Sequence, residues 1–223
     1  MNQKQLLRPA ADASTLGAPL AQFNTADAVV HLNQLDRVQA AAVLAALPLP
    51  RAVKLLEAPE LQRAGELVAA LPPARAAALL GLMADDRATD IVHELDEDER
   101  ARLIPLLEPD ARRSIQLLLG YPPNTAGALM TTEFVSVPAD WTVARTLQHI
   151  REVERTRETV YAIYVLDPQS RQLRQVVTMR RLITGAPEDS ILDVAQVNPP
   201  VSVGPLLDQE EVAQLIRRHD LLA

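Results

Sequence analysis

The segment "LGYPPNTAGALMTTEFVSV", residues 119–137, separates two parts of the chain that have different sequence patterns. Upstream of it, Leu, Ala, Pro and Arg recur in a pattern with almost no strand signal. Downstream, two runs rich in β-branched and aromatic residues predict strands: "YAIYVLD" at 161–167 and "QLRQVVTM" at 172–179. Because its two adjacent prolines are poorly compatible with a continuous helix, the segment predicts a boundary between a helical part and an α/β part.

The composition limits both the fold and the function. Hydrophobic residues make up 48% of the 223 residues but aromatic residues only 3%, which favours packed helices over an all-β fold. The formal net charge of −7 argues against nucleic acid as a partner, since that binding needs a basic surface. The absence of cysteine excludes disulfides, thiolate metal sites and thiol nucleophiles. No apolar run reaches the roughly 18 residues of a membrane helix, so we expect a soluble chain whose residues 1–23 form a flexible leader.

Residues 24–119 consist of four blocks of 24 residues in which the apolar positions align. Within each block, apolar residues recur three and four apart, and a polar or proline-bearing break near the middle predicts two short helices. One such block cannot bury its apolar face alone, so stacked blocks are expected, in a right-handed superhelical array. An irregular helix bundle is the alternative. The aligned columns are Leu32, Leu56, Leu80 and Ile104; Val43, Leu67, Ile91 and Ile115; and Leu47, Leu71, Leu95 and Leu119.

The part that follows Phe134 reads as strand, helix, strand, turn, strand, helix. We expect Asp140 or Thr142 to cap the first of these helices and Asp167, followed by proline, to form the turn between the strands. The pattern then restarts with "PVSV" at 200–203 and a helix that Asp208 and Glu211 would cap as a pair. The chain ends where the next strand is expected, so we predict a fragment of a longer protein.

The β-α-β-β-α order, with "TV-A---L" opening the first helix and "VLD-----L--VVTMRRLI" closing the unit, resembles a CBS domain. The junction "YPPNTAGALMTTEFVSVPADWTVARTLQHIR" and the upstream segments "LPPARAAALL" and "DDRATD" resemble the MgtE family of magnesium channels and transporters. The resemblance extends over residues 24–223 and implies an α+β chain. Its expected parts are a superhelical N domain at 24–120, a linker at 121–133, a first CBS domain at 134–197 and the first half of a second at 198–223.

Asp86, Asp90 and Glu94 are spaced four residues apart and would form a stripe of carboxylates on one helix face. Like charges at this spacing repel, and Mg²⁺ would relieve the repulsion because it prefers carboxylate oxygens and retained waters. The residues alone leave two interpretations open: a Mg²⁺ site, or a solvent-exposed face whose first acid caps the helix. The resemblance implies the Mg²⁺ site, since Asp86 and Asp90 match the magnesium-binding acids of the family's N domain.

A second acidic group, Asp208, Glu210 and Asp220, lies in "DQEEVAQLIRRHD". Taken alone, it predicts a capped helix with exposed charges. The resemblance implies that acids at these positions help to bind Mg²⁺ at domain interfaces.

The CBS resemblance also implies an adenine nucleotide such as ATP as a ligand. Tyr161 could stack on the adenine and Arg180 could reach a phosphate, although a strand tyrosine and a surface charge are the simpler interpretation. The sequence departs from the family at two positions. Arg181 stands where an acid usually binds the ribose hydroxyls, and Lys54 stands where the family often has an acid facing the CBS domain.

The resemblance implies a regulatory region at the cytoplasmic face of the cell membrane, which senses Mg²⁺ and gates a pore outside this chain. Its partners would be its own transmembrane domain and a second copy in a homodimer. Acidic faces that repel one another when bare would come together when Mg²⁺ binds. The alternatives are a soluble helical-repeat scaffold and an adenine-nucleotide sensor without a pore. An enzyme is not expected, because no P-loop, GxGxxG or GxSxG motif is present.

Overall fold

The structure, a computed structural model, describes residues 23–153, 160–196 and 198–221. Its contacts divide the chain into two units, and the division falls between Pro123 and Asn124. The first unit is entirely helical in its described part, and the second combines a small sheet with helices. This division into a helical and an α/β part is the one that the junction segment predicts.

Each 24-residue block of the first unit forms two short helices, as the repeat predicts. Each block also begins with a residue that favours a helix start: Asn24, Pro48, Pro72 and Asp96 are the N-caps of the first helix in their blocks. The helices are α2 (Thr25–Gln34) and α3 (Arg37–Ala46); α4 (Leu49–Leu56) and α5 (Ala64–Ala70); α6 (Pro73–Leu80) and α7 (Asp85–Glu94); and α8 (Glu97–Leu103) and α9 (Pro109–Leu119), with the 3-10 turn η2 (Ile104–Leu106) between the last two.

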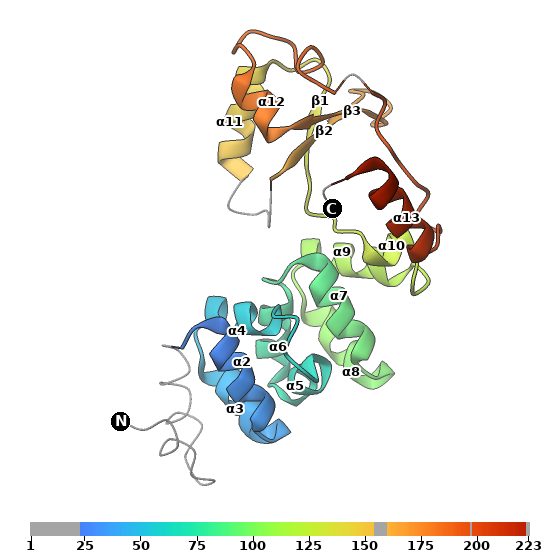
Figure 1. Cartoon of the computed structure of the whole chain (residues 1–223). Coiled ribbons are helices and arrows are strands. Elements are labelled where there is room, and N and C mark those ends of the chain that lie inside the picture. The colour runs from blue at the N-terminus through green and yellow to red at the C-terminus, as the bar shows by residue number, and fades with distance from the viewer. Residues whose placement is uncertain (1–22, 154–159, 197, 222–223) are drawn as a thin grey trace. The chain divides into compact units, whose positions relative to one another are not determined.

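The blocks stack in the order of the sequence, from α2 and α3 in blue to α7, α8 and α9 in green (Figure 1). The first helices contact one another in the series α2, α4, α6 and α8, and the second helices do so in the series α3, α5, α7 and α9. Two rows of helices therefore enclose one continuous core, which confirms the stacked array.

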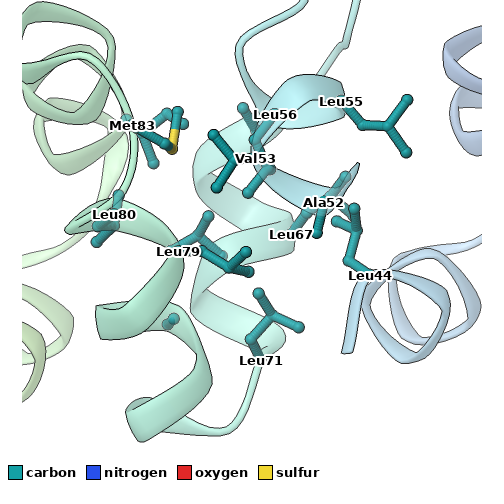
Figure 2. Packing of buried hydrophobic residues seen from close by; sticks show 14 of the residues in the cluster. Leu44, Ala52, Val53, Leu55, Leu56, Leu67, Leu71, Leu79, Leu80 and Met83 are labelled. Atoms are coloured by element: carbon teal, nitrogen blue, oxygen red, sulfur yellow. The ribbon is translucent and has the colours of Figure 1, made fainter. Parts of the chain in front are cut away.

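The aligned apolar columns supply much of this core. Val43, Leu67, Ile91 and Ile115 are each at most 1% exposed, although each lies in a different block. Figure 2 shows how side chains from α3 to α6, with Met83 just beyond α6, point into the same interior. Complete burial of one such side chain contributes about 1.5–3 kcal/mol.

Arginines at equivalent positions of two blocks connect each of them to the block before. Arg51 Nη2 donates to the carbonyl oxygen of Phe23, directly before the first block, at 2.6 Å and to that of Asn24, its first residue, at 3.3 Å. Arg75 Nη2 donates to the carbonyl oxygens of Leu47 and, at 3.1 Å, of Leu44. These carbonyls lie where a helix ends or just before one begins, where backbone groups lack helical partners. The arginines therefore stabilise the stacking as well as the helix ends.

The second unit contains a three-stranded sheet in the order β1-β2-β3. β1 (Val135–Pro138) pairs in parallel with β2 (Ala162–Leu166), which pairs antiparallel with β3 (Leu173–Thr178). Alternate strand residues are buried on one face, and α11 (Val143–Val153) and α12 (Met179–Thr184) lie together on one side of the sheet (Figure 1). Thr142, rather than Asp140, accepts a hydrogen bond from the first turn of α11, and Asp167 forms the expected turn between β2 and β3.

Part of the expected linker 121–133 is ordered within the second unit. It contains α10 (Ala126–Leu129), which packs against α13 (Gln209–His219). Backbone hydrogen bonds join the two segments: Ala126 N donates to Leu207 O at 2.8 Å, and Gln209 N donates to Asn124 O at 2.9 Å. Residues 124–129 are therefore attached to the segment that opens α13, although some 80 residues separate them in the sequence.

α13 has an amphipathic sequence, yet none of its residues is buried against the described part of its unit. Among the described helices, none combines the length and the hydropathy that crossing a membrane requires.

Candidate functional site

The acidic stripe lies on α7, and the preceding block holds both ends of this helix. At its start, the backbone N–H of Ala84 donates to Glu57 Oε1 at 2.9 Å, and Glu57 directly follows α4. At its end, Glu94 Oε2 accepts a hydrogen bond from the backbone N–H of Gly65 in α5 at 2.7 Å. α7 buries Ile91 and its neighbours against the core, so its acidic face has a defined position within the unit.

Asp86 lies in the first turn of α7, where the positive end of the helix dipole favours a carboxylate. Its side chain is half-buried. Its Oδ1 atom is enclosed and has no hydrogen-bond partner among the described residues. An enclosed acceptor without a donor is unfavourable, and a bound cation would remove this cost.

Asp90, one turn further along α7, is exposed and pairs with Arg87: Arg87 Nη1 lies 3.1 Å from Asp90 Oδ2. Glu94, the third acid of the predicted stripe, already accepts the hydrogen bond from Gly65. The structure therefore separates the stripe into three roles. Asp86 keeps an oxygen without a partner, Asp90 is paired with Arg87 of the same helix, and Glu94 connects two blocks.

The positions of Asp86 and Asp90 limit the number of protein ligands that a metal ion could have on α7. Within residues 23–153, 160–196 and 198–221, no group of three or more His, Asp or Glu side chains is placed to hold a metal ion. Mg²⁺ is commonly bound by only one or two carboxylates and keeps several waters. Asp86 and Asp90 lie one helical turn apart and match that mode in residue type and spacing, and the described residues form no cage of protein ligands.

The second predicted group, Asp208, Glu210 and Asp220, is not brought together. Asp208 caps α13 by accepting a hydrogen bond from the N–H of Glu210 at 2.8 Å, so the expected pair with Glu211 is wrong. Asp220 is the residue at the other end of α13, in left-handed backbone geometry with φ 50°. A rise of about 1.5 Å per residue separates the two ends by about 18 Å. Asp220 therefore cannot share one ion with the other two acids of the same chain.

Tyr161 and Arg180 lie at the same end of the sheet. Tyr161 directly precedes β2, and its carbonyl oxygen accepts a hydrogen bond from Met179 N, at the start of α12, at 3.0 Å. Tyr161 is 70% exposed, and Arg180 is exposed as well. An aromatic ring and a cation are thus both accessible there, as a stacked base and a phosphate would need.

Arg181 and Lys54, the two departures from the family pattern, have different surroundings. Arg181 Nη1 donates to the carbonyl oxygen of Ala195 at 2.7 Å and thus connects α12 to the segment after it. This structural contact accounts for a second arginine where an acid was expected. Lys54 is exposed on α4.

Glu57, Arg87 and the role of Glu94 were not predicted from the sequence. The two glutamates bind backbone groups 27 and 29 residues away, separations slightly longer than one block. The 24-residue period was the signal available for these two bonds, because it predicts that residues about one block apart lie close together. Arg87 could have been found from its i, i+3 spacing to Asp90.

Comparison with known proteins shows the same two parts. The family profile of the MgtE intracellular N domain matches residues 23–124, and that of the CBS domain matches residues 126–188. The magnesium transporter MgtE of Bacillus subtilis is 37% identical over 111 residues, and that of Enterococcus faecalis is 41% identical over 109. The match to the Thermus thermophilus protein is 37% identical over 113 residues. Each match covers about half of this chain and 24% of the relative, so the chain matches about a quarter of these transporters.

Among the solved structures that resemble this chain, two align with 94% of it. The soluble part of a magnesium transporter is 29% identical with a TM-score of 0.81, and the alignment covers 94% of this chain and 82% of that one. The cytosolic domain of the Mg²⁺ channel MgtE in complex with ATP is 31% identical with a TM-score of 0.82, and the alignment covers 94% and 85%. The chain thus belongs to the MgtE family of magnesium transporters, with the helical N domain and the CBS domain of that family's cytosolic part.

Proposed function

We propose that this chain is the cytosolic regulatory region of a magnesium transporter, and that it senses intracellular Mg²⁺ and gates the membrane pore of the full protein. Membership of the MgtE family supports the transporter part of the proposal. The observation that carries the sensing part is the enclosed, unpaired Oδ1 of Asp86, one turn from Asp90 on a helix with both ends held.

Asp86 and Asp90 would hold Mg²⁺ through one oxygen each, and water would complete the octahedral shell. Such a site binds weakly, because most of the ion's ligands remain solvent. Weak binding suits a sensor of an ion whose concentration is near millimolar. In the second unit, Asp208 and Glu210 at one end of α13 and Asp220 at the other would act as separate weak sites.

Several weak sites are sufficient for a switch. A ligand that binds only one of two states stabilises that state by about 1.4 kcal/mol per site when its concentration is ten times Kd. Three such sites change the ratio of the two states by about a thousandfold. The mechanism is electrostatic: bound Mg²⁺ neutralises acids that repel one another when bare, and the regulatory region then adopts the state that closes the pore.

The test of sensing is a Mg²⁺ titration of this chain at constant ionic strength, followed by backbone amide NMR. We expect saturable shifts between about 1 and 10 mM for the amides around Asp86 and Asp90, because the ion changes the field in the first turns of α7. Asp86→Asn/Asp90→Asn should abolish these shifts. The matched control is Asp98→Asn, an exposed acid of α8, which should leave them unchanged. Equal shifts in both variants would reject the site.

The gating part needs the full protein. In liposomes that contain the full-length transporter, raising Mg²⁺ on the cytoplasmic side should slow transport, and the double variant should transport faster at high Mg²⁺. Transport that is independent of Mg²⁺ on that side would reject gating. The same preparation reports the proposed location at the cytoplasmic face and, by cross-linking, whether a second copy is the partner.

A second candidate function is adenine-nucleotide sensing, with or without a pore. Its support is the exposed ring of Tyr161 next to the start of α12, where Arg180 lies, together with the similarity to a cytosolic MgtE domain in complex with ATP. Calorimetric titration with ATP tests it. Tyr161→Ala should weaken binding about 5- to 150-fold, since stacking on one base contributes about 1–3 kcal/mol. If the wild type binds ATP and both Tyr161→Ala and Arg180→Ala bind it with the same affinity, this site is excluded.

A further inference from the structure

We propose that Arg87 acts as a built-in competitor of Mg²⁺ for Asp90 and thereby sets the ion affinity of the α7 site. This inference rests on the proposed function, because it concerns the regulation of the same site. According to this inference, a basic residue, and not the acids alone, keeps the Mg²⁺ affinity of the α7 site low enough for a sensor.

The geometry of α7 supports this role. Arg87 directly follows Asp86 in the sequence and lies three residues before Asp90. Its Nη1 atom is 3.1 Å from Asp90 Oδ2, within ordinary N–H···O hydrogen-bonding distance. Its side chain is 34% exposed, and its Nε atom is enclosed without a hydrogen-bond partner among the described residues. The guanidinium is therefore partly shielded from solvent, and the contact that α7 offers it is the Asp90 carboxylate.

The ion and the guanidinium compete for the same group. Mg²⁺ requires oxygen ligands at about 2.0–2.1 Å in nearly octahedral geometry, and a carboxylate already held by Arg87 meets that requirement less well. If Arg87 leaves, the free energy of the ion pair is lost. If Arg87 stays, its positive charge lies a few ångströms from a divalent cation and repels it. Both routes weaken Mg²⁺ binding.

The expected effect is moderate. The free energy of one partly exposed ion pair corresponds to a factor of about 1.5 to 5 in affinity. Repulsion between a unit charge and a divalent ion about 6 Å away in water corresponds to a factor of about ten before screening by salt. Removal of the Arg87 charge should therefore tighten Mg²⁺ binding about three- to tenfold.

The test is Arg87→Gln, with Mg²⁺ affinity measured by calorimetry and by amide NMR on the intact chain. The matched control is Arg113→Gln. Arg113 pairs with Asp110 in α9, also three residues apart, and its loss changes the net charge by the same amount. We expect Kd to fall three- to tenfold in Arg87→Gln and less than twofold in Arg113→Gln. An unchanged or higher Kd in Arg87→Gln, or the same fall in both variants, would overturn the proposal.

A second measurement follows the arginine itself. In the wild-type chain, saturation with Mg²⁺ should shift the Nε–Hε NMR signal of Arg87 as the guanidinium leaves Asp90, while that of Arg113 stays in place. A stationary Arg87 signal, together with an unchanged Kd in Arg87→Gln, in a chain that binds Mg²⁺ at Asp86 and Asp90 would refute the competition and leave the proposed function intact. Absence of Mg²⁺ binding in both the wild type and Arg87→Gln would instead refute both.

Discussion

Substitution of Gly65 by alanine tests the contact that holds the end of the acidic helix. Gly65 lies in the first turn of α5, and its N–H donates to Glu94 Oε2 at 2.7 Å. A β-carbon built on Gly65 would lie 2.7 Å from Glu94 Oε2 and closer still to Glu94 Cβ. Carbon atoms in ordinary contact are about 3.5–4 Å apart, so α5 and α7 would have to separate.

The magnitude follows from three contributions. Alanine in a helix is normally about 1 kcal/mol more favourable than glycine. Overpacking costs about 1–3 kcal/mol, and the hydrogen bond to a charged carboxylate, if lost, about 1.5–3 kcal/mol. We therefore expect Gly65→Ala to destabilise the first unit by about 1.5–5 kcal/mol, opposite in sign to the helix-propensity effect.

The assay is thermal unfolding of the intact chain, followed by circular dichroism at 222 nm, which is dominated by the helical unit. A loss of 1 kcal/mol lowers the unfolding temperature of a domain of this size by about 4–8 °C. The control is Gly81→Ala, because a β-carbon there would meet only the carbonyl oxygen of Ala77, at 3.3 Å. Gly65→Ala that unfolds at or above the wild-type temperature would show that the close approach of α5 and α7 is incorrect.

Three further predictions concern other contacts. Arg75→Met should destabilise the first unit by about 2–4 kcal/mol in urea unfolding, because two carbonyl oxygens at the end of the preceding block lose a charged donor; a cost below 0.5 kcal/mol would contradict this role. Leu182→Ala should cost about 2–5 kcal/mol and lower the unfolding midpoint of the second unit but not of the first, since Leu182 is fully buried in the second core. Hydrogen bonds from the backbone N–H groups of Ser170 and, as the second largest cause, Gln169 hold the pKa of Asp167 below its ordinary value of 3.8. The stability that these bonds give the second unit is therefore complete above about pH 4 and is lost as the pH falls through the lowered pKa. Asp167→Asn should make the urea midpoint of the second unit less dependent on pH in that acid range, and an unchanged pH dependence would exclude this turn as a source of acid sensitivity.

Asp86 and Asp90 were chosen as candidate ligands from their spacing and the family resemblance, and their role as ligands stays a prediction. The structure places them one turn apart on α7, as that spacing requires. The different surroundings of the two carboxylates were not predictable from that spacing, because the surroundings depend on the tertiary structure around α7. Asp220 was grouped with Asp208 because the two are near in sequence, yet the length of α13 places them at opposite ends.

The sequence by itself determined the features that are set within one block or one turn. The 24-residue apolar period, the caps at Asn24 and Asp96, and the turn at Asp167 are all local, because each depends on residues a few positions apart. The boundary between the helical and the α/β part was likewise readable from the change of period. These features were sufficient for the fold class and the stacking order.

Only the tertiary structure decided which groups the stacked blocks bring together. The bonds from Glu57 to Ala84 N and from Glu94 to Gly65 N join residues 27 and 29 positions apart. They form because packing of the apolar faces sets the offset between neighbouring blocks, and a one-dimensional period does not specify that offset. In the same structure Asp86 Oδ1 is enclosed without a partner among the described residues, whereas Glu94 accepts the bond from Gly65. The spacing of these acids in the sequence does not distinguish them.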